Sequence, residues 1–120
     1  MKILVTTTGR SLDAAVDPRF GRAELFALFD LDTDQLEIVD NRSGVEATQG
    51  AGIQAAELAA RLGVDVVVTG HCGPKAFQAL AAADIQVVAG ASGTVAQSID
   101  DYRSGRLQPA TAPDVRGHWG

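Results

Sequence analysis

The densest group of chemically capable residues follows a run of valines and reads Gly70-His71-Cys72-Gly73-Pro74. Thiolate and imidazole are soft or borderline metal ligands. The glycines would let the backbone approach a ligand closely, and a helix beginning at Pro74 would direct N–H groups and a partial positive charge towards it. That helix terminus, together with His71 or Lys75, would favour the thiolate form of Cys72. The segment therefore predicts a site for a metal or an anion.

The same residues also allow plainer interpretations. A lone cysteine after a buried strand can pack as a small apolar side chain, and His71 can be an exposed loop residue. Two adjacent ligands cannot complete a zinc site, and the sequence has no CxxC or HxxxH pair. Gln78 stands where a tyrosine-phosphatase loop would need an arginine, and Ser92 lacks a nucleophile-elbow context. Binding is favoured over catalysis, with a thiol-dependent enzyme using Cys72 as the alternative.

A second dense cluster precedes the first and reads Asp17-Pro18-Arg19-Phe20-Gly21-Arg22. Arg19 and Arg22 could present their guanidinium groups to an anion while Phe20 anchors the loop. Alternatively, Asp17 could form an ion pair with one of these arginines and hold the loop shut. The two interpretations are compatible, so both stay open.

Composition limits the classes of function. The chain has 120 residues, 46% hydrophobic and 21% charged, which fits one globular domain. Its net charge of −5 argues against non-specific nucleic-acid binding, which needs an excess of Lys and Arg. A single cysteine excludes an internal disulfide and fits a reducing, cytoplasmic compartment. No apolar stretch is long enough for a transmembrane helix.

Hydrophobic patterns predict the elements that must position these clusters. Strands are expected at residues 3–5, 25–29, 36–39, 64–69 and 85–89, and helices at residues 53–62, from Pro74 onward and from Thr94 to about Gly105. Gly63 is expected to end the first helix in a left-handed conformation, and Thr94 with Gln97 has the spacing of a capping box. Residues 10–22 and 41–52 have no sustained period and are interpreted as loops.

This order of elements favours an α/β fold with a mixed five-stranded sheet. The first half forms a hairpin, whereas the strand–helix–strand units of the second half require parallel pairing. In such sheets, ligands bind beyond the carboxyl ends of the parallel strands. Four segments could reach that edge: residues 7–22, 50–52, 70–74 and 90–94.

Five short segments in register resemble the dinitrogenase iron–molybdenum cofactor biosynthesis family, found in NifX-type carriers and at the C-terminus of NifB-type proteins. They read VDPRFGRA (16–23), GAGI (50–53), GVD (63–65), GPKAF (73–77) and GASGT (90–94). The resemblance runs from Met1 to about Leu107. It implies a ribonuclease-H-like, three-layer fold with strand order 3-2-1-4-5, the second strand antiparallel and helices on both faces. The domain would cover residues 1–107, followed by a flexible tail at 108–120.

The family resemblance also implies a function. The protein would bind or carry, without catalysis, an iron–molybdenum cofactor or a related metal–sulfide cluster or metallo-anion. Its partners would be cofactor-assembly or nitrogenase-type proteins, with a homo-oligomer left open, and a regulatory interaction domain is a further alternative. By motif position the cofactor-binding residues are Arg19, Phe20, Gly21, Arg22, Gly70, His71, Cys72 and Gly73. The candidate metal ligands are His71, Cys72 and, from the tail, His118, whose alternative is an unligated terminal residue.

Overall fold

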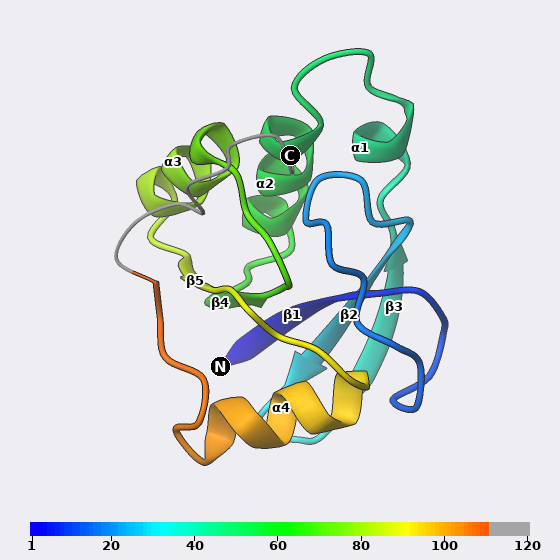
Figure 1. Ribbon diagram of the computed structural model, residues 1–120, viewed down its shortest axis with the longest axis vertical. Coiled ribbons are helices and arrows are strands. Elements are labelled where there is room, and N and C mark those ends of the chain that lie inside the picture. The colour runs from blue at the N-terminus through cyan, green and yellow to red at the C-terminus, as the bar shows by residue number, and fades with distance from the viewer. Residues whose placement is uncertain (111–120) are drawn as a thin grey trace.

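The computed structural model describes residues 1–110, which build a five-stranded mixed sheet between helices (Figure 1). The strands are β1 (Lys2–Thr7), β2 (Leu25–Asp30), β3 (Leu36–Asp40), β4 (Val66–Val68) and β5 (Gln86–Val88). The helices are α1 (Arg42–Glu46), α2 (Ala51–Arg61), α3 (Pro74–Ala82) and α4 (Val95–Arg103).

The order of the strands across the sheet is β3-β2-β1-β4-β5. Strand β2 is antiparallel to both β1 and β3, whereas β4 is parallel to β1 and to β5. The predicted order and the antiparallel second strand are therefore confirmed. Strand β1 thus has an antiparallel neighbour, β2, on one side and a parallel neighbour, β4, on the other. Because β1, β4 and β5 are parallel, their C-terminal ends lie at the same edge of the sheet, which we call the carboxyl edge.

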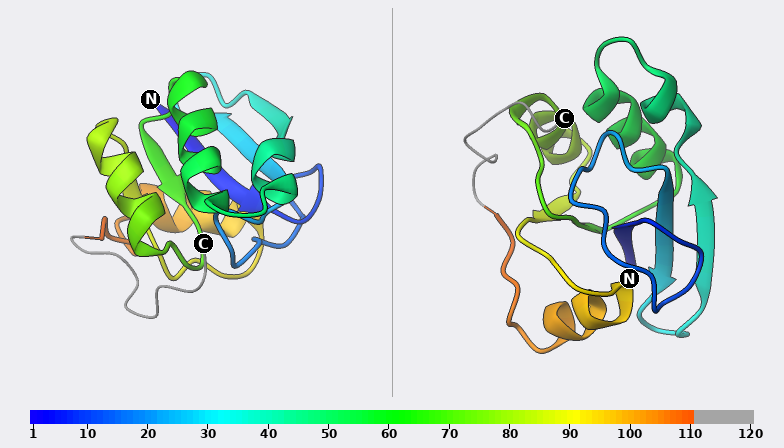
Figure 2. Two further views of the ribbon diagram at one scale, coloured as in Figure 1. Left: turned by 90° about the horizontal axis from the view of Figure 1, so that it is seen from above. Right: turned by 45° about the vertical axis from the view of Figure 1, so that its right-hand side comes forward.

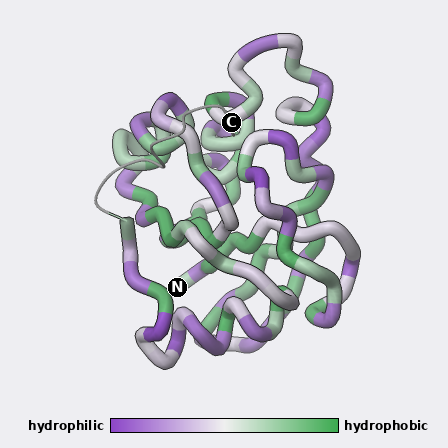
Figure 3. The backbone as a smooth tube through the Cα atoms, in the orientation of Figure 1, coloured by the Kyte–Doolittle hydropathy of each residue, from purple (hydrophilic) through white to green (hydrophobic). Residues whose placement is uncertain are grey.

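Helices cover both faces of the sheet, as predicted (Figures 1 and 2). Leu4 of β1 belongs to the core beneath α2 and α3, whereas Ile3 and Val5 belong to the core beneath α4. This division follows from the two-residue period of a strand, which sends successive side chains to opposite faces. Figure 3 shows the apolar residues concentrated along the central strands. The broader ribonuclease-H-like classification stays a prediction.

The residues predicted to begin and end helices do so. Gly63 has a φ of 71° directly after α2, a left-handed conformation that costs a glycine little. Pro74 is the first residue of α3. At the start of α4, the Gln97 N–H donates to Thr94 Oγ1 at 3.1 Å and the Thr94 N–H donates to Gln97 Oε1 at 2.9 Å. These two bonds complete the predicted capping box.

One helix was not predicted. The sequence of residues 41–52 predicts a loop, but the segment contains the five-residue helix α1. Its sequence, RSGVE, has a central glycine and no apolar period, so nothing local indicates a helix. The loop interpretation is therefore wrong for this part of the segment.

The last described residues return to the sheet. The Ala110 N–H donates to the Val87 carbonyl oxygen at 2.6 Å, at the outer side of β5. Residues 108–110, assigned to the tail by sequence, thus contact the domain, whereas His118 lies outside the described residues. Between residues 1 and 110, no helix combines the length and the apolar character that a membrane span requires.

Candidate functional site

The two clusters found in the sequence meet at the carboxyl edge of the sheet. Arg19 and His71 form an isolated parallel bridge. The His71 N–H donates to the Pro18 carbonyl at 2.7 Å, and the Phe20 N–H donates to the His71 carbonyl at 3.2 Å. The bridge lies just beyond β1 and β4, where a ligand site is expected in a sheet of this topology.

Two glycines of the clusters allow backbone segments to pack directly on one another. A Cβ atom on Gly70 would lie 2.8 Å from Pro18 Cα and 2.9 Å from Pro18 O. A Cβ atom on Gly21 would lie 2.7 Å from the Gly52 nitrogen, at the start of α2. The structure therefore places both glycines where close packing requires them, and it places the start of α2 beside the Arg19 loop.

Buried hydroxyl groups attach this loop to the ends of two strands. Thr6 and Thr69 are fully buried, and their Oγ1 atoms lie 2.9 Å apart. Thr6 Oγ1 also lies 2.7 Å from the Asp17 carbonyl oxygen. A hydroxyl carries one proton, so Thr6 donates to Asp17 and Thr69 donates to Thr6. The Asp17 N–H returns a bond to the Thr6 carbonyl at 2.9 Å.

The loop is also attached to the start of α4. The Val16 N–H donates to the Gly93 carbonyl at 2.9 Å, and Ala15 forms a bridge with Thr94. The segment between β1 and β2 thus contacts both the β4–α3 and the β5–α4 connections. These attachments define the backbone path without help from exposed side chains.

Arg19 and Asp17 form an ion pair, as one of the two sequence interpretations proposed. Arg19 Nε lies 3.7 Å from Asp17 Oδ1, and the Arg19 backbone N–H donates to the same oxygen at 2.9 Å. The Arg19 side chain keeps 48% of its surface exposed, whereas the Asp17 side chain keeps 10%. The pair therefore orients Arg19 without removing its guanidinium group from the surface.

Arg22 contacts the end of α1, and its expected role as an anion donor stays a prediction. Its Nη1 group donates to the carbonyl oxygens of Val45 at 3.2 Å and Ala47 at 2.8 Å. These carbonyls belong to the end of α1, where backbone acceptors lack partners within the helix. Arg22 thus holds α1 against the loop, a contact that its expected role as an anion donor did not include.

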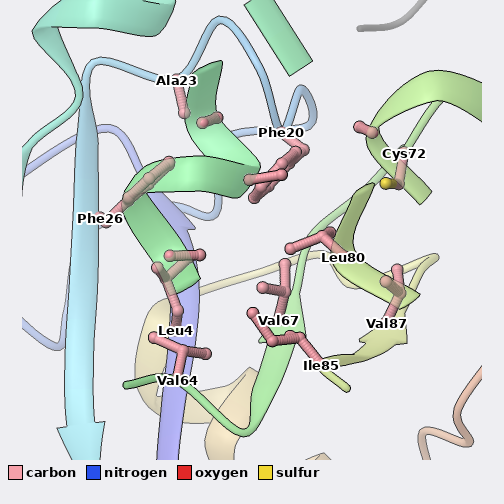
Figure 4. Close-up of a cluster of buried hydrophobic side chains, with 14 of the residues drawn as sticks. Leu4, Phe20, Ala23, Phe26, Val64, Val67, Cys72, Leu80, Ile85 and Val87 are labelled. Atoms are coloured by element: carbon pink, nitrogen blue, oxygen red, sulfur yellow. The ribbon is translucent and has the colours of Figure 1, made fainter. Parts of the chain in front are cut away.

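Phe20 anchors the loop in the core. Its side chain is fully buried and stacks on Phe26 with ring centroids 5.8 Å apart and an interplanar angle of 6° (Figure 4). The predicted anchor is confirmed. The buried ring fixes the neighbouring backbone of the loop, whereas the predicted part of Phe20 in cofactor binding stays a prediction.

Cys72 is placed in the apolar core beside the start of α3, with only 1% of its surface exposed (Figure 4). Its Sγ faces the Gly73 carbonyl at 3.9 Å, whereas the neighbouring His71 is only partly buried. Among residues 1–110, no three His, Cys, Asp or Glu side chains are arranged to hold a metal ion. Metal ligation by His71, Cys72 and His118 stays a prediction.

Comparison with known proteins decides the family. The family model described as dinitrogenase iron-molybdenum cofactor matches residues 1–105. The chain belongs to this family. The resemblance inferred from the five motifs is thereby confirmed.

Solved structures of similar proteins agree in fold with nearly the whole chain, and a further relative is similar in sequence. The apo orange protein of Desulfovibrio gigas is 44% identical, with a TM-score of 0.92 over 94% of this chain and 95% of that one. A putative NifB protein from Thermotoga, of the DUF35 family, is 29% identical, with a TM-score of 0.82 over 94% and 96%. An uncharacterised protein of Methanocaldococcus jannaschii is 28% identical over 78% of this chain and 80% of its own length.

Proposed function

We propose that this protein binds and carries an iron–molybdenum cofactor, or a related metal–sulfide cluster or metallo-anion, without catalysing a reaction on it. The observation that carries the proposal is the bridge that sets Arg19 opposite His71 at the carboxyl edge of the sheet. The cargo would be exchanged in the cytoplasm with cofactor-assembly or nitrogenase-type proteins.

The chemistry of this pair suits an anionic, sulfide-rich cargo. A half-exposed guanidinium group can donate several hydrogen bonds to an anion. The partly buried imidazole of His71 can bind a borderline metal. Helix α3 begins three residues later, and its first turn adds a partial positive charge on the same side of the sheet.

The burial of Cys72 supports carriage over thiol chemistry. A nucleophilic cysteine needs an accessible thiolate, and this side chain has 1% of its surface exposed within the core. The relatives point the same way by name: one structure is described as an apo form and another as a putative NifB protein.

Anaerobic titration with tetrathiomolybdate tests the proposal, with the charge-transfer absorbance as the readout. Wild-type protein should give a saturable band. Arg19→Ala and His71→Ala should each weaken binding about ten- to hundredfold, the range expected for losing a charge-assisted contact. The matched control is Arg61→Ala, which removes the same charge from an exposed position at the end of α2. Absence of a saturable band, or equal losses in Arg19→Ala and Arg61→Ala, would refute the proposal.

A further inference from the structure

The candidate site contains a negative charge that an anion carrier does not need for binding. Asp17 is the only buried charged side chain among residues 1–110. Its Oδ1 atom lies 2.9 Å from the Arg19 nitrogen and 3.7 Å from Arg19 Nε. Any anion that reaches the guanidinium group of Arg19 therefore approaches a carboxylate as well.

This carboxylate cannot easily move away from the site. The Asp17 N–H donates to the Thr6 carbonyl, and the Asp17 carbonyl accepts from the Thr6 hydroxyl, which is in turn held by Thr69. The side chain closes an Asx turn onto the Arg19 N–H across Pro18, whose ring further restricts the backbone. Asp17 thus contributes a fixed negative charge next to the Arg19 side chain.

A fixed charge has two effects on an anion bound at Arg19. Asp17 pairs with Nε of Arg19, so the two terminal Nη groups are the part of the guanidinium group furthest from the carboxylate. An anion is therefore expected to bind at the Nη groups. Repulsion between the carboxylate and the anion lowers affinity, and it grows with the charge of the anion. The first effect orients the site, and the second weakens its hold on the cargo.

We propose that Asp17 is a positioning residue and a built-in counter-charge that speeds the release of anionic cargo. The inference rests on the proposed carrier function and deepens it. A carrier must surrender its cargo to the next protein, so binding that is too tight would defeat its purpose. Asp17 keeps the cargo exchangeable by opposing part of the attraction of Arg19.

The variant Asp17→Asn separates charge from geometry, because the amide oxygen can still accept the Arg19 N–H. With tetrathiomolybdate as the probe, Asp17→Asn should lower both Kd and the dissociation rate about five- to tenfold at low ionic strength. The difference should shrink as salt is added, and the absorbance maximum should stay where it is in the wild type. A purely structural role would predict weaker binding instead.

Two further variants serve as controls. Asp40→Asn removes an exposed acid that pairs with Arg10 at 3.3 Å, and it should change Kd less than about twofold. Thr69→Val disturbs the hydroxyl network without changing charge, so it should lower stability without tightening binding. Should Asp17→Asn fail to fold by circular dichroism, Asp17→Ser keeps a short acceptor for the turn and carries the same expectation.

The outcomes distinguish this inference from the function on which it rests. Normal wild-type binding with unchanged or weaker binding by folded Asp17→Asn would overturn the counter-charge alone. Equal tightening by Asp40→Asn would show a general effect of net charge and would also overturn it. Absence of saturable binding in every variant would overturn the carrier function and the inference together.

Discussion

Arg19 and His71 are held opposite one another by their backbones: His71 bonds to Pro18 and Phe20, the two neighbours of Arg19. The side chains of the pair take no part in these bonds. Backbone bonds, close-packed glycines and buried hydroxyls therefore set the geometry of the site, whereas the proposed ligand contacts belong to the side chains of Arg19 and His71. Substitutions of the two kinds should have separable effects on stability and on binding.

Gly70→Ala should destabilise the protein and displace the Arg19 loop. The added methyl group would meet backbone atoms of Pro18 at 2.8 and 2.9 Å, and backbone cannot move aside as a flexible side chain can. We expect a loss of about 1–3 kcal/mol in the free energy of unfolding, measured by urea denaturation, together with weaker tetrathiomolybdate binding.

The control for this substitution is Gly63→Ala, at the end of α2. Its added Cβ would meet no atom within 4 Å, but its φ of 71° is unfavourable for alanine. It should cost about 1 kcal/mol and leave binding unchanged. Equal binding by Gly70→Ala and wild type would contradict the close-packing role of Gly70.

Thr6→Val and Thr69→Val should be strongly coupled. Thr6→Val leaves the buried Asp17 carbonyl without the hydroxyl donor, so it should cost about 1–3 kcal/mol. Thr69→Val removes the partner of the Thr6 hydroxyl. A double-mutant cycle in urea should give a coupling energy of about 0.5–2 kcal/mol, whereas additive losses would show that the two hydroxyls act independently.

Arg22→Ala should loosen α1 and leave binding nearly intact. The substitution removes the donors to the Val45 and Ala47 carbonyls. Amide hydrogen exchange should accelerate in residues 42–47, with a loss of about 1–2 kcal/mol in unfolding free energy. Arg42→Ala, an exposed residue of the same helix, is the control. A loss of tetrathiomolybdate binding as large as that of Arg19→Ala would contradict this prediction and support Arg22 as an anion donor.

Cys72 should react slowly with iodoacetamide in the folded protein. Since 1% of its surface is exposed, alkylation requires the core to open, and we expect a rate at least about 100-fold below that in urea. Gln78→Cys in a Cys72→Ala background provides an exposed thiol on the same helix. If Cys72 of the folded protein were alkylated as fast as this introduced thiol, the result would support the alternative function, a thiol-dependent enzyme.

Elements with local signals could be predicted from the sequence. The helix that follows Pro74, the left-handed Gly63 and the capping box of Thr94 each depend on a few neighbouring residues, and each was found as expected. Strand order followed from the family resemblance, because pairing between distant strands leaves no comparable local pattern.

Features decided by distant contacts could not be predicted. The partners of Arg22 lie on α1, which itself lacks an apolar period. The burial of Cys72 depends on the packing of α3 onto the sheet, and the same loop sequence fits an exposed ligand equally well. Thr6 and Thr69 resemble ordinary polar residues at strand ends until the fold brings their hydroxyls to 2.9 Å.

The attachment of the β1–β2 segment to Gly93 and Thr94 has a consequence during protein synthesis. Residues 15 and 16 leave the ribosome long before their partners at the start of α4, so the segment lacks these attachments until most of the chain has been made. The loop that carries Arg19 can close only on a nearly complete domain. Under the proposed carrier function, a nascent chain would therefore not bind cargo, and loading would begin only after translation has passed α4.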